Sequence, residues 1–282
     1  MIVGIIGLGL IGGSLAISLK KRGFASKIIG VDKSVIHCKE AVNIGFVDEI
    51  CLLNEVLDKV DIVILAIPVD AGRQLLPLLL DTVKTDQVII DMGSTKEGIC
   101  KVANEHHNRK NFVASHPIAG TENAGPLAAF NGLFDEKITI ICDGEKSNIA
   151  ALKLCKKLYS VLNMKILTMS AEEHDRHIAY VSHLSHITSF VLGQTVLEIE
   201  KEEKHIFNMA GSGFASTVRL AKSSPNMWAP IFEQNKEHVS NALDTYIKNL
   251  QQFKHNIDQG KKEDLHSLMS DVNDIRRVLK GL

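Results

Sequence analysis

The chain begins with a glycine loop between two apolar segments. The run IVGII (Ile2–Ile6) leads into GLGLIG, in which Gly7, Gly9 and Gly12 are spaced as GxGxxG, and an apolar stretch with helical spacing follows. In this context the first glycine allows a tight turn, the second lets the backbone approach a phosphate, and the third lets the helix pack closely on the strand. The loop therefore predicts a strand, loop and helix that bind a dinucleotide at the helix N-terminus.

An acidic residue stands where such a fold contacts the adenosine ribose. Asp32 ends the apolar run that starts at Lys27, and it lies twenty residues past Gly12. Its carboxylate can accept hydrogen bonds from both ribose hydroxyls and would repel a 2′-phosphate, so the pattern favours NAD over NADP. The adjacent Lys33 weakens this preference, because its positive charge would suit the 2′-phosphate of NADP. The predicted cofactor-binding residues are Gly7, Gly9, Leu10, Ile11, Gly12 and Asp32.

Short β-branched runs alternate with amphipathic stretches up to about residue 168. Runs that are apolar throughout are typical of strands buried on both faces of a parallel sheet. The pattern predicts an α/β domain over residues 1–168, of the Rossmann type with a doubly wound parallel sheet. The predicted strands are Ile2–Ile6, Lys27–Asp32, Asp61–Ile67, Gln87–Asp91, Asn111–Ser115, Ile138–Cys142 and Met164–Ser170.

Helical patterns fill the rest of the chain. From Ala171 to Leu282 the sequence is helical in pattern, with breaks near Gly211–Gly213 and Ser223–Pro225. We therefore expect a second, all-α domain over residues 169–282. The stretch from His177 to Ile199 carries apolar residues around most of its circumference, more than a solvated surface helix needs. It is predicted to be buried, in a helical bundle or in a dimer interface.

Composition excludes several classes of protein. With 282 residues and a net charge of −1, the chain has no excess of basic residues for binding a phosphate backbone. Its five cysteines are scattered and never form C-x-x-C, which disfavours disulfides and zinc and indicates buried thiols in a reducing compartment. Glycines interrupt the apolar N-terminus, and no basic stretch precedes it, unlike a signal peptide or membrane span. We expect a cytoplasmic protein without nucleic-acid or membrane partners.

Two polar residues follow strands that should end beside the nicotinamide. Ser94 comes after the run that ends at Asp91, and His116 comes after the run that ends at Ser115. A histidine suits a site that must take up the proton of an alcohol as hydride leaves its carbon. A lone histidine is more often structural, and Ser94 by itself could equally be a helix N-cap.

The helical part contains two histidines spaced i, i+3. His183 and His186 can face one side of a helix, but no set of carboxylates accompanies them, so we predict no metal site. His174, Asp175 and His177, near the start of the same segment, are expected to be surface or capping residues.

Five motifs together resemble the TyrA family, the prephenate and arogenate dehydrogenases of tyrosine biosynthesis. They are GLGLIGGSL, DMGSTK, SHPIAGTE, SHLSH and GSGFASTVRLAKSSPNMW, and they span nearly the whole chain in the family's order. The resemblance implies a nucleotide domain followed by a helical dimerisation domain, with the active site between them, and a homodimer that uses NAD. It implies the oxidative decarboxylation of prephenate to 4-hydroxyphenylpyruvate.

The resemblance also assigns roles to residues. It implies that His116 is the catalytic histidine that accepts the proton of the substrate's ring hydroxyl, and that Ser94 helps to hold this hydroxyl. A guanidinium offers a permanently charged, bidentate fork, which suits the implied role of Arg219 in binding a substrate carboxylate. The implied substrate-binding residues are Thr121, Glu122, His186 and Arg219. Ser185 departs from the family, which commonly has proline there. The sequence therefore does not predict whether this helix bends at Ser185.

Three alternatives remain at this point. An arogenate dehydrogenase would act on a substrate with an ammonium in place of the keto group, which Glu122 could bind. The β-hydroxyacid dehydrogenases and their imine-reducing relatives share a glycine-loop domain followed by helices, but they lack the SHPIAGTE loop. A non-catalytic NAD-binding module would have no need for His116, Ser94 and Arg219 together.

Overall fold

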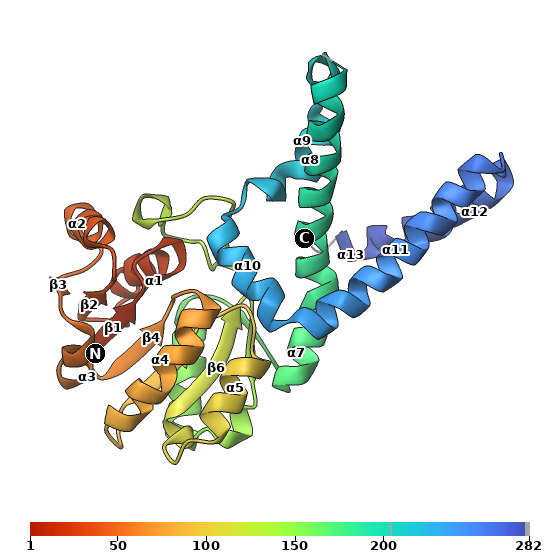
Figure 1. Cartoon of the computed structure of the whole chain (residues 1–282). Coiled ribbons are helices and arrows are strands. Elements are labelled where there is room, and N and C mark those ends of the chain that lie inside the picture. Colours follow the sequence, from red (N-terminus) through yellow and green to blue (C-terminus); the bar gives the residue numbers. More distant parts are fainter. Residues whose placement is uncertain (204, 280–282) are drawn as a thin grey trace. The chain divides into compact units, whose positions relative to one another are not determined.

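An eight-stranded sheet forms the centre of the N-terminal part of the chain (Figure 1). The computed structural model describes residues 1–203 and 205–279. The strand order is β3-β2-β1-β4-β5-β6-β7-β8. The strands are β1 (Ile2–Ile6), β2 (Lys27–Val31), β3 (Glu49–Ile50), β4 (Ile62–Leu65), β5 (Val88–Asp91), β6 (Phe112–Pro117), β7 (Ile138–Cys142) and β8 (Lys165–Met169).

The predicted strands are confirmed, with ends that differ by at most two residues, and the short strand β3 is an addition. One pairing differs from the predicted parallel sheet, because β7 runs antiparallel to β6 and β8 then runs parallel to β7. The connection from Pro117 to Ile138 contains only one short 3₁₀ turn, Pro126–Ala128, and no crossover helix. A chain that does not cross back over the sheet can return only in the antiparallel direction.

Strand β1 pairs with β2 on one side and with β4 on the other, so the order of the strands changes direction at β1. The carboxyl ends of β1 and β4 therefore border a switch point, where open α/β sheets bind their ligands. Gly7 follows β1, and Ala66 follows β4. The predicted cofactor loop is thus located at this point of the sheet.

Helices cover both faces of the sheet. Ile5 and Ile6 are neighbours in β1, yet they belong to two different hydrophobic clusters, because successive strand residues point to opposite faces. One cluster includes residues of α1 (Leu10–Lys21), α2 (Val35–Ile44) and α6 (Ile149–Val161). The other includes residues of α3 (Val56–Lys59), α4 (Val69–Thr82) and α5 (Glu97–Asn104), and α4 and α5 lie side by side (Figure 1).

Helices make up the rest of the described chain, with the predicted breaks between α8 and α10. The chain forms two compact units, Met1–Lys236 and a second that begins at Glu237. A domain boundary at residue 168 stays a prediction. None of the described helices is both long and apolar enough to cross a membrane. The helices are α7 (Ala171–Ile178), a π-helical turn (Ala179–His183), α8 (Leu184–Glu202), α9 (Ser212–Val218), α10 (Pro225–Gln234), α11 (Lys236–Asp258), α12 (Lys262–Val272) and α13 (Arg276–Leu279).

The predicted burial of the cysteines is confirmed for four of the five. All five are free thiols; Cys51, Cys100, Cys142 and Cys155 are buried, and Cys38 is half-buried. Burial raises the pKa of the Cys100 thiol to about 12, so it stays protonated and unreactive at neutral pH.

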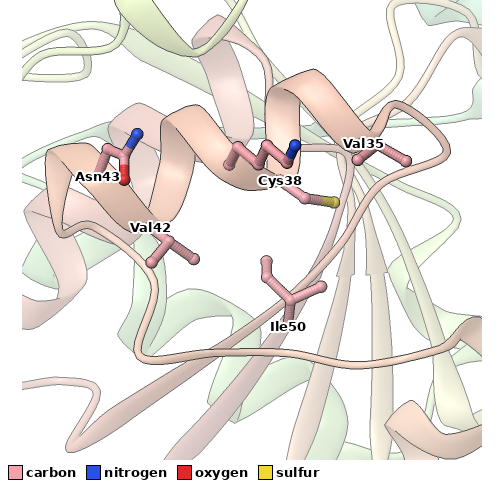
Figure 2. Close-up of a pocket in the computed structure, with 6 residues that line it drawn as sticks. Val35, Cys38, Val42, Asn43 and Ile50 are labelled. Carbon is pink, nitrogen blue, oxygen red and sulfur yellow. The ribbon is translucent and has the colours of Figure 1, made fainter.

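A pocket of about 350 Å³ lies between α2 and β3 at the outer edge of the sheet (Figure 2). Figure 2 shows the side chains of Cys38 and Val42 on the side of α2 toward Ile50, and Val35 near the start of the helix. None of the predicted site residues lines this pocket, so the candidate site lies elsewhere. Its lining residues are Val35, Cys38, Lys39, Val42, Asn43 and Ile50.

Candidate active site

The glycine loop has the tight geometry that its sequence predicts. Gly7 has a φ of +98°, and a Cβ there would lie 2.3 Å from the carbonyl oxygen of Ala66. A Cβ on Gly12 would lie 1.9 Å from the carbonyl oxygen of Gly7, so the helix could not approach the strand. A Cβ on Gly9 would meet nothing within 4 Å. The protein therefore leaves open space at the position where a pyrophosphate needs the backbone bare.

Gly9 is also the N-cap of α1, with extended backbone angles. The first N–H groups of a helix have no partner within the helix and attract anions. Leu10 and Ile11 provide the first two of these N–H groups in α1. Together with the open space at Gly9, this arrangement fits the pyrophosphate of a dinucleotide.

Asp32 is held in place by the backbone on both sides. Its Oδ2 accepts a hydrogen bond from the N–H of Leu8 at 2.8 Å, and its Oδ1 accepts one from the N–H of Ser34 at 2.8 Å. A carboxylate has about four acceptor positions, so oxygen lone pairs remain for two ribose hydroxyls. His37 Nδ1 lies 3.4 Å from Oδ2. The same carboxylate thus ties the glycine loop to the end of β2.

His116 lies near the end of β6 and is joined to two residues of α7. Its Nδ1 lies 2.9 Å from Nε2 of His174, and His174 Nδ1 lies 2.7 Å from Oδ1 of Asp175. His174 is 0% exposed and Asp175 is 1% exposed. The expectation that they are surface residues is wrong, because α7 packs against α5 and turns both side chains inward. His177, on the same helix, is exposed as expected.

Asp175 also caps the start of α5. Its Oδ1 accepts from the backbone N–H of Lys96 at 2.8 Å, and its Oδ2 accepts from the N–H of Glu97 at 2.9 Å. This places the helix start after Lys96, so Ser94 is not its N-cap. The capping prediction for Asp175 is correct, although the helix that it caps is α5 rather than its own.

Lys96 is a buried cation that sequence reasoning did not single out. It is 0% exposed, and its ammonium group forms an ion pair with Asp91 and donates to the carbonyl oxygen of Ser115 at 2.8 Å. The signal was available in DMGSTK, where a lysine follows a strand-ending aspartate. Through these two contacts, Lys96 connects the end of β5 to Ser115, the residue just before His116.

Burial keeps the histidines of this group neutral. It lowers the pKa of His116 well below its usual value, and repulsion by protonated His174, by Lys96 and by protonated His183 lowers it further. Burial also lowers the pKa of His174, although the hydrogen bond to Asp175 opposes this. For Asp175, burial acts to raise the pKa, but the hydrogen bonds from His174, Glu97 and Lys96 outweigh it and lower the pKa. At neutral pH the group is therefore two neutral imidazoles and one carboxylate.

Glu122 and Arg219 form an ion pair. Arg219 Nη1 lies 3.0 Å from Glu122 Oε2, across ninety-seven residues of sequence. A hydrogen bond from its own backbone N–H and the charge of Arg219 lower the pKa of Glu122. Thr121 is exposed, and its hydroxyl accepts from the N–H of Asn123 at 3.2 Å. Among the described residues, no hydrogen bond joins this pair to the His116 group.

His183 and His186 both pack on Trp228. The ring of His186 stacks on the indole with centroids 3.5 Å apart, and its Nδ1 donates to the carbonyl oxygen of Ser182 at 3.0 Å. His183 meets the indole edge-on at 5.9 Å, and its Nδ1 lies 3.1 Å from Nδ2 of Asn235. A π-helical turn, Ala179–His183, precedes Ser185. In residues 1–203 and 205–279, no three His, Cys, Asp or Glu side chains are grouped as metal ligands.

Two family models match the chain. Residues 15–168 match the model described as prephenate dehydrogenase, nucleotide-binding domain, and residues 170–271 match the model described as prephenate dehydrogenase, dimerization domain. The prephenate dehydrogenase of Bacillus subtilis is 31% identical over 274 residues, which are 96% of this chain and 74% of that protein.

Solved structures of related dehydrogenases are also similar to this chain. The crystal structure of prephenate dehydrogenase from Aquifex aeolicus in complex with hydroxyphenyl propionate and NAD+ has 34% identity and a TM-score of 0.91, and covers 99% of this chain and 98% of that one. The Synechocystis arogenate dehydrogenase has 26% identity and a TM-score of 0.76, and covers 99% of this chain and 100% of that one. On the two family models and these similarities, the chain belongs to the prephenate dehydrogenase family.

Proposed function

We propose that this protein oxidises prephenate with NAD and releases 4-hydroxyphenylpyruvate and carbon dioxide, a step of tyrosine biosynthesis. Membership of the family makes it an NAD-dependent oxidoreductase and sets it apart from the β-hydroxyacid dehydrogenases. The observation that carries the proposal is His116 in the SHPIAGTE loop, neutral and hydrogen-bonded through Nδ1, in a chain that matches the family over both of its parts.

The residues around the glycine loop fit NAD. Gly9 and the N–H groups of Leu10 and Ile11 would receive the pyrophosphate, and Asp32 would bind the ribose hydroxyls. When bound, NAD supplies an acceptor for the hydride that leaves the substrate. The open space above Gly9 at the start of α1 supports this role.

His116 serves as the general base. Its Nδ1 is engaged by His174, so Nε2 is the nitrogen that can take the proton of the ring hydroxyl. As the C–H bond of the carbinol carbon gives up its hydride, the hydroxyl becomes a carbonyl. The C–C bond to the ring carboxylate then breaks, carbon dioxide leaves, and the electron pair of that bond restores the aromatic ring as a phenolate, which takes the proton back from His116 to give the phenol. Aromatisation makes the sequence strongly downhill, so orientation of the ring against the nicotinamide should account for much of the rate.

Ser94, Arg219, Glu122, Thr121 and His186 complete the proposed site. Ser94, which precedes Lys96 and the start of α5, would hold the ring hydroxyl with His116. Arg219 would bind a substrate carboxylate, with its Glu122 partner holding the guanidinium in place. His186 and Thr121 would contact the substrate from the helical segment and from the loop.

The contacts of Glu122 favour prephenate over arogenate. The case for arogenate was that Glu122 could bind the substrate's ammonium. Because Glu122 is paired with Arg219 at 3.0 Å, its charge is already compensated. The similarity to the Aquifex prephenate dehydrogenase is also greater than that to the Synechocystis arogenate dehydrogenase.

We further propose a cytoplasmic homodimer. The match to the dimerization-domain model over residues 170–271 supports the dimer. The half-exposed apolar side chains of α8, which include Val191, Leu197 and Ile199, supply a surface for it. The free thiols support a reducing compartment.

The deciding experiment offers the purified protein prephenate or arogenate, each with NAD or NADP, and follows the absorbance of the reduced nicotinamide. We expect turnover with prephenate and NAD. Preference for arogenate would contradict the substrate assignment, preference for NADP would contradict the role of Asp32, and the absence of turnover in all four combinations would leave a non-catalytic NAD-binding module.

A further inference from the structure

We propose that His174 is a positioning residue that, supported by Asp175, holds His116 in the one tautomer whose Nε2 can act as a base. The proposal deepens the function given above and rests on it. Neither residue was predicted to belong to the site, and His174 reaches His116 from fifty-eight residues away in sequence.

Asp175 determines the direction of the hydrogen bonds. Two backbone N–H groups, those of Lys96 and Glu97, point at its oxygens, and an ionised carboxylate only accepts hydrogen bonds. Its contact with His174 Nδ1 at 2.7 Å therefore requires the proton to lie on that nitrogen. The two backbone donors, at 2.8 and 2.9 Å, hold the carboxylate in this position whatever the state of the histidines.

The position of the proton on His174 in turn sets the direction of its hydrogen bond with His116. A neutral imidazole has one donor and one acceptor nitrogen, so His174 with a proton on Nδ1 presents Nε2 as an acceptor. The contact at 2.9 Å can form only if His116 donates from Nδ1. His116 Nε2 is left unprotonated, which is the state that can remove a proton from an alcohol. The opposite tautomer of His116 would place two acceptor nitrogens against each other.

The surrounding charges favour the neutral state of His116 and also allow its protonation on Nε2. The groups that act on the two rings are Lys96 with its partner Asp91, His183 from the π-helical turn, and Asp175 from α7. Burial, and to a smaller extent Lys96, lower the pKa of His116, which keeps Nε2 free. When His116 takes up a proton on Nε2, its Nδ1–H stays donated to His174, and the carboxylate of Asp175 lies one ring further on to balance the charge. No other proton has to move.

The first test measures the tautomer directly. In protein labelled with ¹⁵N at histidine, the shifts of the two ring nitrogens of His116 distinguish a protonated from an unprotonated nitrogen, and the signals are assigned by their loss in His116→Asn. We expect a protonated Nδ1 and an unprotonated Nε2 at neutral pH. A proton on Nε2 would overturn the proposal. Because this measurement needs no substrate, it stands even if prephenate is not turned over.

The second test compares two substitutions of His174. His174→Phe keeps a planar ring but removes the acceptor, so His116 should populate both tautomers and kcat should fall about tenfold or more, with little change in KM. His174→Gln keeps an acceptor oxygen near the position of Nε2, so it should restore the tautomer of His116 and recover kcat to within about threefold of the wild type. His177→Gln, the same change at an exposed position of α7, is the matched control.

A pH profile separates positioning from a structural role. If His174 positions His116, His174→Phe lowers the plateau of kcat at every pH, while the folded protein keeps its affinity for NAD. If His174 only stabilises the fold, the variant unfolds at a lower temperature but keeps the wild-type plateau and tautomer. Wild-type kcat in folded His174→Phe, or a loss in His174→Gln equal to that in His174→Phe, would contradict the proposal.

Discussion

At the residue scale, the partners of a side chain decide what it can do. The described chain contains histidines in very different settings: His177 is exposed, His186 stacks on an indole, and His116 is joined to a second histidine and a carboxylate. Of these three arrangements, the last contains the neutral nitrogen that we propose as the base, near the end of a sheet strand. The residue type suggested the chemistry, and the contacts make it specific.

Replacement of the proposed base should remove turnover and leave binding intact. We expect His116→Asn to lower kcat by about 10²- to 10⁴-fold, the usual contribution of a general base, while KM changes little. Steady-state kinetics with prephenate and NAD measure both constants. A variant with near wild-type kcat would show that another group takes the proton.

The pH dependence follows from the lowered pKa of His116. The reaction needs the neutral form, so kcat/KM should rise with pH through the pKa of His116 and stay level above it. Because burial lowers that pKa below the usual histidine value, the acid limb should lie below about pH 6.5. An acid limb centred above this value would mean that His116 is not the titrating group.

Arg219→Ala should act on binding rather than on chemistry. A charge-assisted hydrogen bond contributes about 1.5–3 kcal/mol, so KM for prephenate should rise by about 10- to 150-fold while kcat changes less. A second variant, Glu122→Gln, keeps a side chain against Arg219 but removes the ion pair, so it tests the ion pair by itself. An unchanged KM in Arg219→Ala would exclude the proposed role in binding the carboxylate.

At the scale of elements, the starts of helices α1 and α5 each depend on residues with distinct structural tasks. In the β1–α1 unit, Gly7 and Gly12 let the helix approach the sheet, whereas Gly9 leaves space for a ligand. At the start of α5, Asp175 from α7 accepts hydrogen bonds that a local cap would normally accept. Both arrangements can be tested by substitutions that separate stability from binding.

The glycines of the loop should respond differently to the same added methyl. Gly12→Ala should lower the free energy of unfolding by about 1–3 kcal/mol, because its Cβ would lie 1.9 Å from a backbone oxygen. Gly9→Ala should change stability little but raise the Kd for NAD about tenfold or more, because its methyl would fill the space for the pyrophosphate. Thermal unfolding without cofactor and calorimetric titration with NAD measure the two effects. Equal affinity for NAD in Gly9→Ala would remove the loop from the cofactor site.

The cap that Asp175 provides for α5 should depend on pH. Because folding lowers its pKa, the carboxylate stabilises the native state above the unfolded-state pKa of about 3.9, and this contribution is lost as pH falls through the folded-state value. We expect Asp175→Asn to be less stable by about 1–3 kcal/mol at neutral pH, with the difference narrowing below about pH 4. Urea unfolding over a range of pH measures this, and a difference that does not depend on pH would contradict it.

At the scale of the whole molecule, exposed apolar side chains outside the sheet need an explanation. Ile247, Leu250 and Ile257 on α11 are each about half exposed, as are Val191 and Leu197 on α8. The sequence predicted that α8 is buried in a bundle or a dimer interface, whereas these side chains of α8 are about half exposed. A second copy of the chain is the partner that the dimerization-domain match supports.

The dimer can be tested with one charge. Light scattering of the intact protein should give twice the chain mass of 31.0 kDa. Leu250→Glu should shift the population towards monomer, whereas Asn249→Glu, which adds the same charge at the neighbouring exposed position, should not. A monomeric wild type, or equal behaviour of the two variants, would contradict the proposed interface.

Several features could be predicted from the sequence because they depend on short segments. The strand positions follow from apolar runs, and the turn after β1 follows from glycines whose neighbours leave no room for a Cβ. The motifs around Ser94, His116 and Arg219 resemble one family, and the comparisons confirm that family. These predictions succeeded because burial and backbone conformation are largely local properties of the chain.

The tertiary structure decided which distant polar groups meet. The antiparallel return of β7, the burial of Lys96, the contact of His174 with His116 and the pairing of Glu122 with Arg219 were not predicted from the sequence. A polar side chain shows in sequence what it can donate or accept, but not which partner the packing of helices and strands will bring within 3 Å. For this protein, local patterns predicted the cofactor loop and the histidine that we propose as the base, whereas long-range packing determines the hydrogen bonds around that histidine.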